Sequence, residues 1–364
     1  MVATSAIENP RRDAGGIMLH RLALISVIGL ALTSAPSAIS AADLEGAGAT
    51  FPYPLYEQWF KAYSTLTQNT VSYEGVGSGE GVTAILDRSV DFGATDVFLD
   101  DGQLQSAGAP LIHIPTCLGA VAITYNLPGI PELRFTPDLI AAIFSGEVTR
   151  WNDRRIADVN PGLRFPDQAI TVVHRTDASG TTHIFTDFLS GTSLRWREEV
   201  GTGNTVGWPV GQGAEGNAGL VDLVKGTEGS IGYVQYAYAD AHEMPVAAIR
   251  NQAAYFIKPT VDSLTAAARV KLPDDARLML TNTDAPDGYP ITSFSYVVMW
   301  AEQKVAGQSR KDAEALVQLW WWAIHDGQAL NEELGYAPLP RNAVIRAENA
   351  LRMITYGGAP LNLN

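Results

Sequence analysis

Residues 172–185 read VVHRTDASGTTHIF, an aliphatic run that ends in an arginine and continues through small and hydroxyl residues into an apolar pattern. Polar and apolar residues alternate too little along residues 170–173 for a half-exposed strand. Such a mainly apolar run is typical of a buried parallel strand. The apolar residues that follow recur at the spacing of one helix face: Ile184, Phe185, Phe188 and Leu189. The stretch therefore predicts a strand, a short loop and a helix.

The same order of strand, small-residue loop and helix recurs along the chain. Its other loops are residues 46–52 (GAGATFP), 75–81 (GVGSGEG) and 211–217 (GQGAEGN). Alternating strands and helices of this kind predict an α/β fold with parallel sheets. In such sheets ligands bind at the carboxyl ends of strands, where helices begin. The recurring loops are therefore the candidate binding segments.

Arg175 places a permanent cation beside a predicted helix start. The first turn of a helix has unpaired N–H groups and about half a positive charge, so an added cation favours a bound anion between them. The small residues Ser179, Gly180 and Thr181 would let that anion approach the backbone closely. Two alternatives are a plain helix cap and a surface ion pair of Arg175 with Asp177. The recurrence of the unit favours an anion site.

An apolar run of 11 residues, LALISVIGLAL at 22–32, follows Arg21 and precedes small residues up to position 42. It is shorter than the roughly 20 residues of a membrane-spanning helix. Residues 1–42 are therefore expected to be a signal peptide cleaved before Asp43. Met18 is an alternative start, in which case residues 1–17 are not translated. The remaining chain is expected in the periplasm, exported, soluble and not lipid-anchored, because Cys117 lies far from the cleavage site.

The formal net charge is −14, which argues against nucleic acid and anionic membranes as partners. Cys117 is the one cysteine of the sequence, so no internal disulfide can form. It lies in the apolar run 117–123, which predicts a buried small hydrophobic residue.

Common enzyme motifs do not fit this sequence. The glycines at 75, 77, 79 and 81 match neither the dinucleotide fingerprint nor the phosphate loop of nucleotide hydrolases. Val76 and Glu80 stand where a hydrolase nucleophile elbow around Ser78 would need glycine. The six histidines show no metal-ligand spacing. We therefore expect no catalysis, no metal and no cofactor.

Several motifs together resemble the periplasmic phosphate-binding proteins of high-affinity phosphate ABC transporters. They are residues 46–51 (GAGATF), 75–79 (GVGSG), 91–96 (DFGATD), 151–153 (WND), 175–181 (RTDASGT), 229–239 (GSIGYVQYAYA), 289–293 (YPITS) and 336–340 (YAPLP). They follow one another in order and cover nearly the whole chain after position 42.

This resemblance implies a type II periplasmic binding protein fold. Two α/β lobes, each with a mainly parallel sheet flanked by helices, would be joined by crossover strands and close on a ligand. Lobe I would comprise residues 43–116 and 291–364, and lobe II residues 117–290. The implied function is capture of inorganic phosphate in the interlobe cleft and its delivery to the permease subunits of the transporter. The free protein would be a monomer.

The resemblance also implies a phosphate-binding set: Thr50, Phe51, Ser78, Asp96, Arg175, Ser179, Gly180 and Thr181. Asp177 would support Arg175. Phosphate near neutral pH still carries a P–O–H group, and Asp96 can accept that hydrogen bond. Sulfate has no such proton, so a carboxylate in the site would exclude it.

Two positions depart from the family pattern: Glu80 beside Ser78, and Val97–Phe98 after Asp96. If Glu80 pointed inward, affinity or ligand choice would change. The alternatives are binding of another tetrahedral oxyanion (phosphite, arsenate or a phosphate ester), a secreted phosphatase, and a surface protein whose binding fold is incidental.

Overall fold

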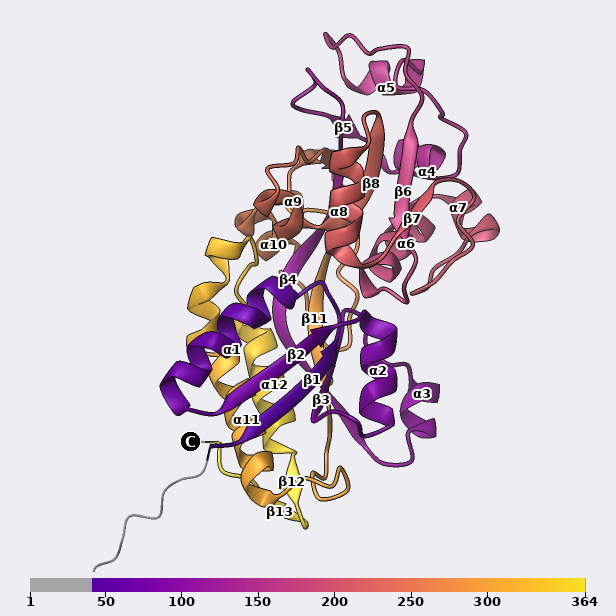
Figure 1. The fold of residues 1–364 in the computed structure, drawn as a ribbon. Coiled ribbons are helices and arrows are strands. Elements are labelled where there is room, and N and C mark those ends of the chain that lie inside the picture. Colours follow the sequence, from indigo (N-terminus) through magenta and orange to yellow (C-terminus); the bar gives the residue numbers. More distant parts are fainter. Residues whose placement is uncertain (1–40, 364) are drawn as a thin grey trace, which may run out of the picture. The chain divides into compact units, whose positions relative to one another are not determined.

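The computed structural model describes residues 41–363, drawn in colour in Figure 1. The predicted signal peptide lies outside these residues, except for its last two positions. All that follows concerns residues 41–363. Within the described residues, no helix combines the length and the apolar character that crossing a membrane requires.

The main sheet has eight strands in the order β2-β1-β3-β11-β4-β8-β6-β7. Their bounds are β1 Asp43–Gly48, β2 Thr70–Gly75, β3 Phe92–Thr95, β4 Leu111–Tyr125, β6 Thr171–Arg175, β7 Gln212–Ala214, β8 Ser230–Gln235 and β11 Thr292–Trp300. β1 pairs in parallel with β2 and β3, and β6 pairs in parallel with β7 and β8. Each end of the sheet is therefore parallel, as the alternation of strands and helices predicts.

Strand β4 links the two parallel parts. Its residues 111–120 pair with β11 in antiparallel orientation, and its residues 121–125 pair with β8. All of its side chains except the first are buried. Cys117 lies within it, free and buried, as its apolar surroundings predict.

A helix follows each of the four predicted loops (Figure 1): α1 Tyr53–Thr67, α2 Ser78–Leu86, α6 Gly180–Thr192 and α8 Gly216–Gly226. β1 leads through α1 outward to β2, and β2 leads through α2 back across β1 to β3. Right-handed crossovers in opposite directions place α1 and α2 on opposite faces of the strands. The loops before both helices consequently open at one edge of the sheet, where the carboxyl ends of the strands lie.

The remaining elements complete the layers around this sheet. The helices are α3 Asp101–Ser106, α4 Pro137–Phe144, α5 Arg154–Val159, α7 Leu194–Glu199, α9 Tyr236–Ala241, α10 Val261–Ala267, α11 Arg310–Ala323 and α12 Arg341–Arg352, with 3-10 turns η1 Asp326–Leu330 and η2 Glu332–Leu334. A three-stranded sheet contains β5 Arg134–Phe135, β9 Ala248–Arg250 and β10 Phe256–Ile257. A two-stranded sheet contains β12 Thr355–Tyr356 and β13 Ala359–Pro360.

The core beside β1 is aromatic. Trp320 of α11 is fully buried and meets Phe60 of α1 and Phe92 of β3 edge-on, at ring distances of 6.0 and 5.0 Å. Trp321 and Trp322 are half-buried on the same helix, so the tryptophan run packs this C-terminal helix against its neighbours. These contacts fix α1 and α11 against the strand edge from which the binding loops emerge.

Gly81 allows α2 to lie directly on the sheet. A Cβ added there would stand 2.4 Å from Gly48 Cα and 2.6 Å from the carbonyl oxygen of Ala94. Both neighbours are backbone atoms in paired strands, so they cannot yield without distorting the sheet.

We expect Gly81→Ala to reduce the free energy of unfolding by about 2–3 kcal/mol, because overpacking outweighs the better helix propensity of alanine. Gly191→Ala is the matched control, since a Cβ at this position in α6 meets nothing within 4 Å. It should leave stability unchanged or raise it by about 0.5–1 kcal/mol. Urea unfolding of the ligand-free protein measures both; equal stabilities of the two variants would contradict the packing argument.

Candidate anion-binding site

Two helix starts supply amide donors at the carboxyl ends of the strands. α2 begins at Ser78 after Gly77, whose φ of 100° is accessible mainly to glycine, and α6 begins at Gly180 after Ser179. Among residues 41–363, the backbone N–H groups without an acceptor include those of Thr50 and Phe51, in the loop before α1, and those of Ser78, Gly180 and Thr181. Unpaired amides at helix starts are the usual elements of an anion site.

The two helix starts face one another. Gly79 of α2 donates its N–H to the carbonyl oxygen of Ala178 at 2.9 Å. A Cβ on Gly180 would lie 2.3 Å from Ser78 Oγ and 2.5 Å from Asp96 Oδ2. Gly180 therefore lies against both side chains, and only glycine leaves room for this approach.

Asp96 is a buried carboxylate that contacts both helix starts. Its Oδ1 accepts from Ser295 Oγ at 2.8 Å while its Oδ2 accepts from Ser78 Oγ at 3.2 Å. Burial raises the pKa of Asp96 to about 7, although the hydrogen bonds from Ser295 and Ser78 and the charge of Arg175 act in the opposite direction. Near neutral pH the group can thus either accept or donate a proton.

Arg175 ends β6 and is held by Asp177. Its Nε donates to Asp177 Oδ1 at 2.6 Å, and a second guanidinium nitrogen pairs with Oδ2. Gly216 N–H also donates to Asp177 Oδ1 at 3.0 Å. Burial opposes ionisation of Asp177, but the hydrogen bonds and charge of Arg175, with the Gly216 bond, lower its pKa overall. The pair fixes the guanidinium and leaves its Nη1 3.5 Å from Thr181 Oγ1.

Ser179 acts partly as the helix cap that its sequence position suggests. Its Oγ accepts from Thr182 N–H at 3.1 Å, and its own N–H donates to Asn204 O at 2.9 Å. Its amide is therefore occupied, while its hydroxyl hydrogen remains to donate. The donors of this helix start are the amides of Gly180 and Thr181 and the hydroxyls of Ser179 and Thr181.

Asn217 contacts two residues of the site, although the sequence analysis did not include it among the predicted site residues. Its Nδ2 donates to Thr50 Oγ1 at 2.9 Å and to Thr181 Oγ1 at 3.2 Å, and its Oδ1 accepts from Gln235 N–H at 2.9 Å. Because both threonine oxygens accept from Asn217, their own hydrogens are free for another acceptor. The signal was present in the sequence, since Asn217 lies at the start of the helix in the fourth recurring unit.

The structure thus brings the eight predicted residues together through these contacts, Phe51 by its backbone. The two departures from the family pattern lie outside this group. Glu80 is exposed in the first turn of α2, so it does not point into the site. The ring of Phe98 packs edge-on against Tyr296, with 6.3 Å between the ring centroids. The guanidinium carbon of Arg277 lies over the Phe98 ring, 6.0 Å from its centroid.

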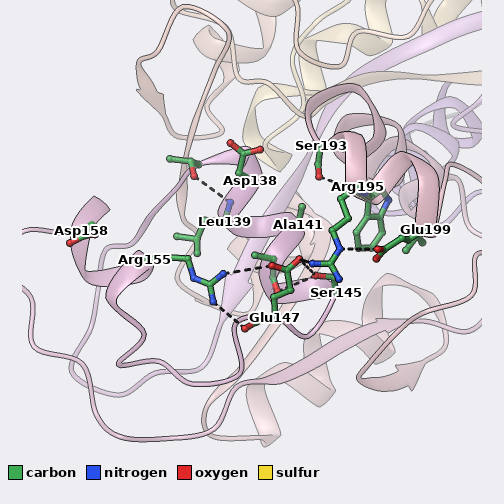
Figure 2. A pocket seen from close by; sticks show the side chains of 14 residues that line it. Asp138, Leu139, Ala141, Ser145, Glu147, Arg155, Asp158, Ser193, Arg195 and Glu199 are labelled. Carbon is green, nitrogen blue, oxygen red and sulfur yellow. Dashed lines mark hydrogen bonds and ion pairs between the residues drawn. The ribbon is translucent and has the colours of Figure 1, made fainter.

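A separate cavity of about 470 Å³ lies between α4, α5 and α7 and contains none of the predicted residues. Figure 2 shows Glu147 between Arg155 and Arg195, with Glu199 paired to Arg195 in turn. Opposite charges alternate along this exposed network, so it links surface segments and offers no set of unpaired donors. No group of three His, Cys, Asp or Glu side chains in residues 41–363 is arranged to hold a metal ion.

Residues 33–316 match the family model of the PBP superfamily domain. The phosphate-binding protein PstS of Xylella fastidiosa is 39% identical over 323 residues, 87% of each chain. PstS of Haemophilus influenzae is 37% identical over 307 residues, which are 83% of this chain and 90% of that one. The chain therefore belongs to the PstS family of phosphate-binding proteins. This confirms the resemblance inferred from its motifs, and membership of a family of binding proteins agrees with the expectation that it is not an enzyme.

Solved structures show the same fold. A high-affinity periplasmic phosphate-binding protein (PfluDING) has a TM-score of 0.68 at 23% identity, covering 84% of this chain and 93% of that chain. An ABC-type phosphate transport receptor from Vibrio cholerae has a TM-score of 0.53 at 17% identity, covering 82% and 100%. The predicted α/β periplasmic binding protein fold is confirmed.

The raised pKa of Asp96 predicts how stability depends on pH. An unfolded aspartate titrates near pH 4, so between pH 4 and about 7 the folded chain holds one proton more than the unfolded chain. Stability from this group is therefore full at low pH and is lost as pH rises to about 7. In phosphate-free buffer, the unfolding free energy of the native chain should fall relative to Asp96→Asn by about 1.4 kcal/mol per pH unit across this window. A pH-independent difference in urea unfolding would show that Asp96 is not protonated in the fold.

Proposed function

We propose that this chain binds inorganic phosphate between the first turns of α2 and α6 and delivers it to the permease of an ABC transporter. The observation that carries the proposal is a buried carboxylate, Asp96, among donors that otherwise suit an anion. The unpaired amides at these loops, the nearby hydroxyls and Arg175 would bind the phosphate oxygens. Hydrogen bonds to charged groups contribute roughly 1.5–3 kcal/mol each, so several of them support micromolar or tighter binding.

Asp96 discriminates between oxyanions by their protonation state. A phosphate P–O–H can donate to the ionised Asp96, so carboxylate and ligand share a hydrogen bond. Sulfate at the same place would set two anionic oxygens against each other in a buried site. Sites whose buried polar groups are left unpaired reject the wrong ligand by about 10⁴ to 10⁵. Arsenate has a protonation state similar to that of phosphate near neutral pH, so Asp96 would not exclude it.

Burial of the site argues against a phosphate ester as ligand. Ser78, Asp96, Arg175, Ser179 and Thr181 are each at most 3% exposed. An organic substituent on the phosphate would therefore have no path to solvent in this arrangement.

We further propose that the ligand lies between two lobes, residues 43–116 with 291–364 and residues 117–290. β4 supports this division, because its pairing changes from β11 to β8 between residues 120 and 121. One stretch of the second range packs with the first: Asp274 pairs with Arg346 of α12, and Arg277 pairs with Asp101 of α3. Residues 274–277 therefore belong with lobe I in this proposal.

For the location, we propose export to the periplasm, without a lipid anchor and as a monomer when free. The predicted leader, the absence of a cysteine near its cleavage site and the periplasmic binding protein fold support this.

Calorimetry of residues 43–364 with phosphate, arsenate and sulfate tests the function. We expect micromolar or tighter phosphate binding and no measurable sulfate binding at pH 8. Arg175→Ala should weaken phosphate at least about 100-fold, because it removes a buried charged donor. Arg155→Ala, in the surface network, is the control and should bind like the parent. Sulfate bound more tightly than phosphate would refute the proposal.

Asp96→Asn tests the origin of the selectivity. An amide has no negative charge and offers N–H donors to sulfate, so the phosphate-to-sulfate affinity ratio should fall at least about tenfold. Asp91→Asn changes a partly buried carboxylate at the start of the same motif, and it should leave the ratio unchanged. The role of Asp96 is wrong if both variants exclude sulfate as well as the parent does.

A further inference from the structure

The turn between β1 and α1 has three consecutive carbonyl groups, of residues 49–51, and each accepts a hydrogen bond from a tyrosine hydroxyl. Tyr73 of β2 donates to the first at 2.7 Å. Tyr238 of α9 donates to the second at 2.7 Å. Tyr336, after η2, donates to the third at 2.5 Å. Three segments that are remote in sequence thus converge on one turn of the proposed site.

These bonds determine where the neighbouring amides point. A trans peptide is planar, so the carbonyl of one residue and the N–H of the next point in opposite directions. The bond from Tyr73 to Ala49 O therefore also orients the N–H of Thr50. In the same way, the bond from Tyr238 to Thr50 O orients the N–H of Phe51. Both N–H groups lack an acceptor within residues 41–363.

We propose that Tyr73 and Tyr238 are positioning residues for phosphate, which aim the N–H groups of Thr50 and Phe51 at the anion by holding the carbonyls behind them. This inference rests on the proposed function. The same bonds keep two carbonyl oxygens, which would repel an anion, turned away from it. The tyrosines act through the backbone of the turn.

The surroundings of the phenols suit this role. Burial raises the pKa of Tyr73, Tyr238 and Tyr336 above the ordinary value, so all three remain neutral donors. The ring of Tyr73 stacks on Phe92, with 6.0 Å between the ring centroids, and this ring contact does not involve the hydroxyl. A phenylalanine at this position would therefore keep the packing and lose only the donor.

The second carbonyl has a further, weaker partner. Thr50 O also accepts from Tyr53 N–H at 3.3 Å, in the first turn of α1, whereas no second donor to Ala49 O is present in the described chain. Loss of the Tyr73 hydroxyl should therefore affect binding more than loss of the Tyr238 hydroxyl.

Tyr336 provides an internal control. The residue after Phe51 is Pro52, which has no N–H, so the peptide that Tyr336 holds has no donor to aim. Tyr336→Phe removes a hydrogen bond from the same turn and leaves a buried carbonyl unpaired. It should reduce stability without a matching change in affinity for phosphate.

The test compares Tyr73→Phe, Tyr238→Phe and Tyr336→Phe in the full mature chain. Calorimetry with inorganic phosphate should show about tenfold weaker binding for the first and about fivefold for the second. The third should stay within about twofold of the parent. Urea unfolding without phosphate gives the loss of stability in each, so that affinity can be separated from folding.

Amide chemical shifts provide a readout that a purely structural role would not change. In the parent chain, phosphate should move the amide protons of Thr50 and Phe51 downfield. Tyr73→Phe should diminish mainly the shift of Thr50, and Tyr238→Phe mainly that of Phe51. Tyr336→Phe should preserve both.

The outcomes separate this inference from the function on which it rests. If the parent chain binds no phosphate, the proposed function fails, and the inference fails with it. If the parent binds and all three variants bind equally well, only the inference is overturned. It is also overturned if Tyr336→Phe weakens binding as much as the other two, because the tyrosines would then act through the rigidity of the turn.

Discussion

The site depends on two helix starts that face each other with their first amides unpaired. Each start carries about half a positive charge, whereas the charge of Arg175 is balanced by Asp177, so the two facing starts favour a negative group between them. Asp96 supplies part of that charge from within. The family to which the chain belongs binds phosphate, and an anion between the starts of α2 and α6 would balance the remainder.

Close packing makes this approach of the two helices feasible. Gly81 lets α2 lie on the backbone of β1 and β3, and Gly180 lets α6 reach Ser78 and Asp96. A side chain at either place would separate the donors by more than a hydrogen bond tolerates. The overall charge of −14 does not prevent anion binding, because local dipoles and one guanidinium act at short range in a buried site.

The structure adds a supporting layer that holds the donors. Asp177 fixes Arg175, Asn217 turns the hydroxyls of Thr50 and Thr181, and tyrosines hold the carbonyls behind two of the amides. None of these contacts requires a ligand to be present. A donor set that is already oriented loses little entropy when an anion arrives, which is how rigid sites gain affinity.

The sequence by itself determined the α/β class, the four strand–loop–helix units and the donors at their loops, because hydrophobic periodicity and small residues at helix starts are local patterns. It also pointed to Asp96, through the resemblance of residues 91–96 to a motif of phosphate-binding proteins. Only the tertiary structure decided that Glu80 faces solvent, that Asn217 bridges two hydroxyls, and that Tyr238 reaches a carbonyl 188 residues away. Such contacts join segments that are distant in the chain, and their partners carry no local signature, so they exist only once the sheet order has brought the loops together.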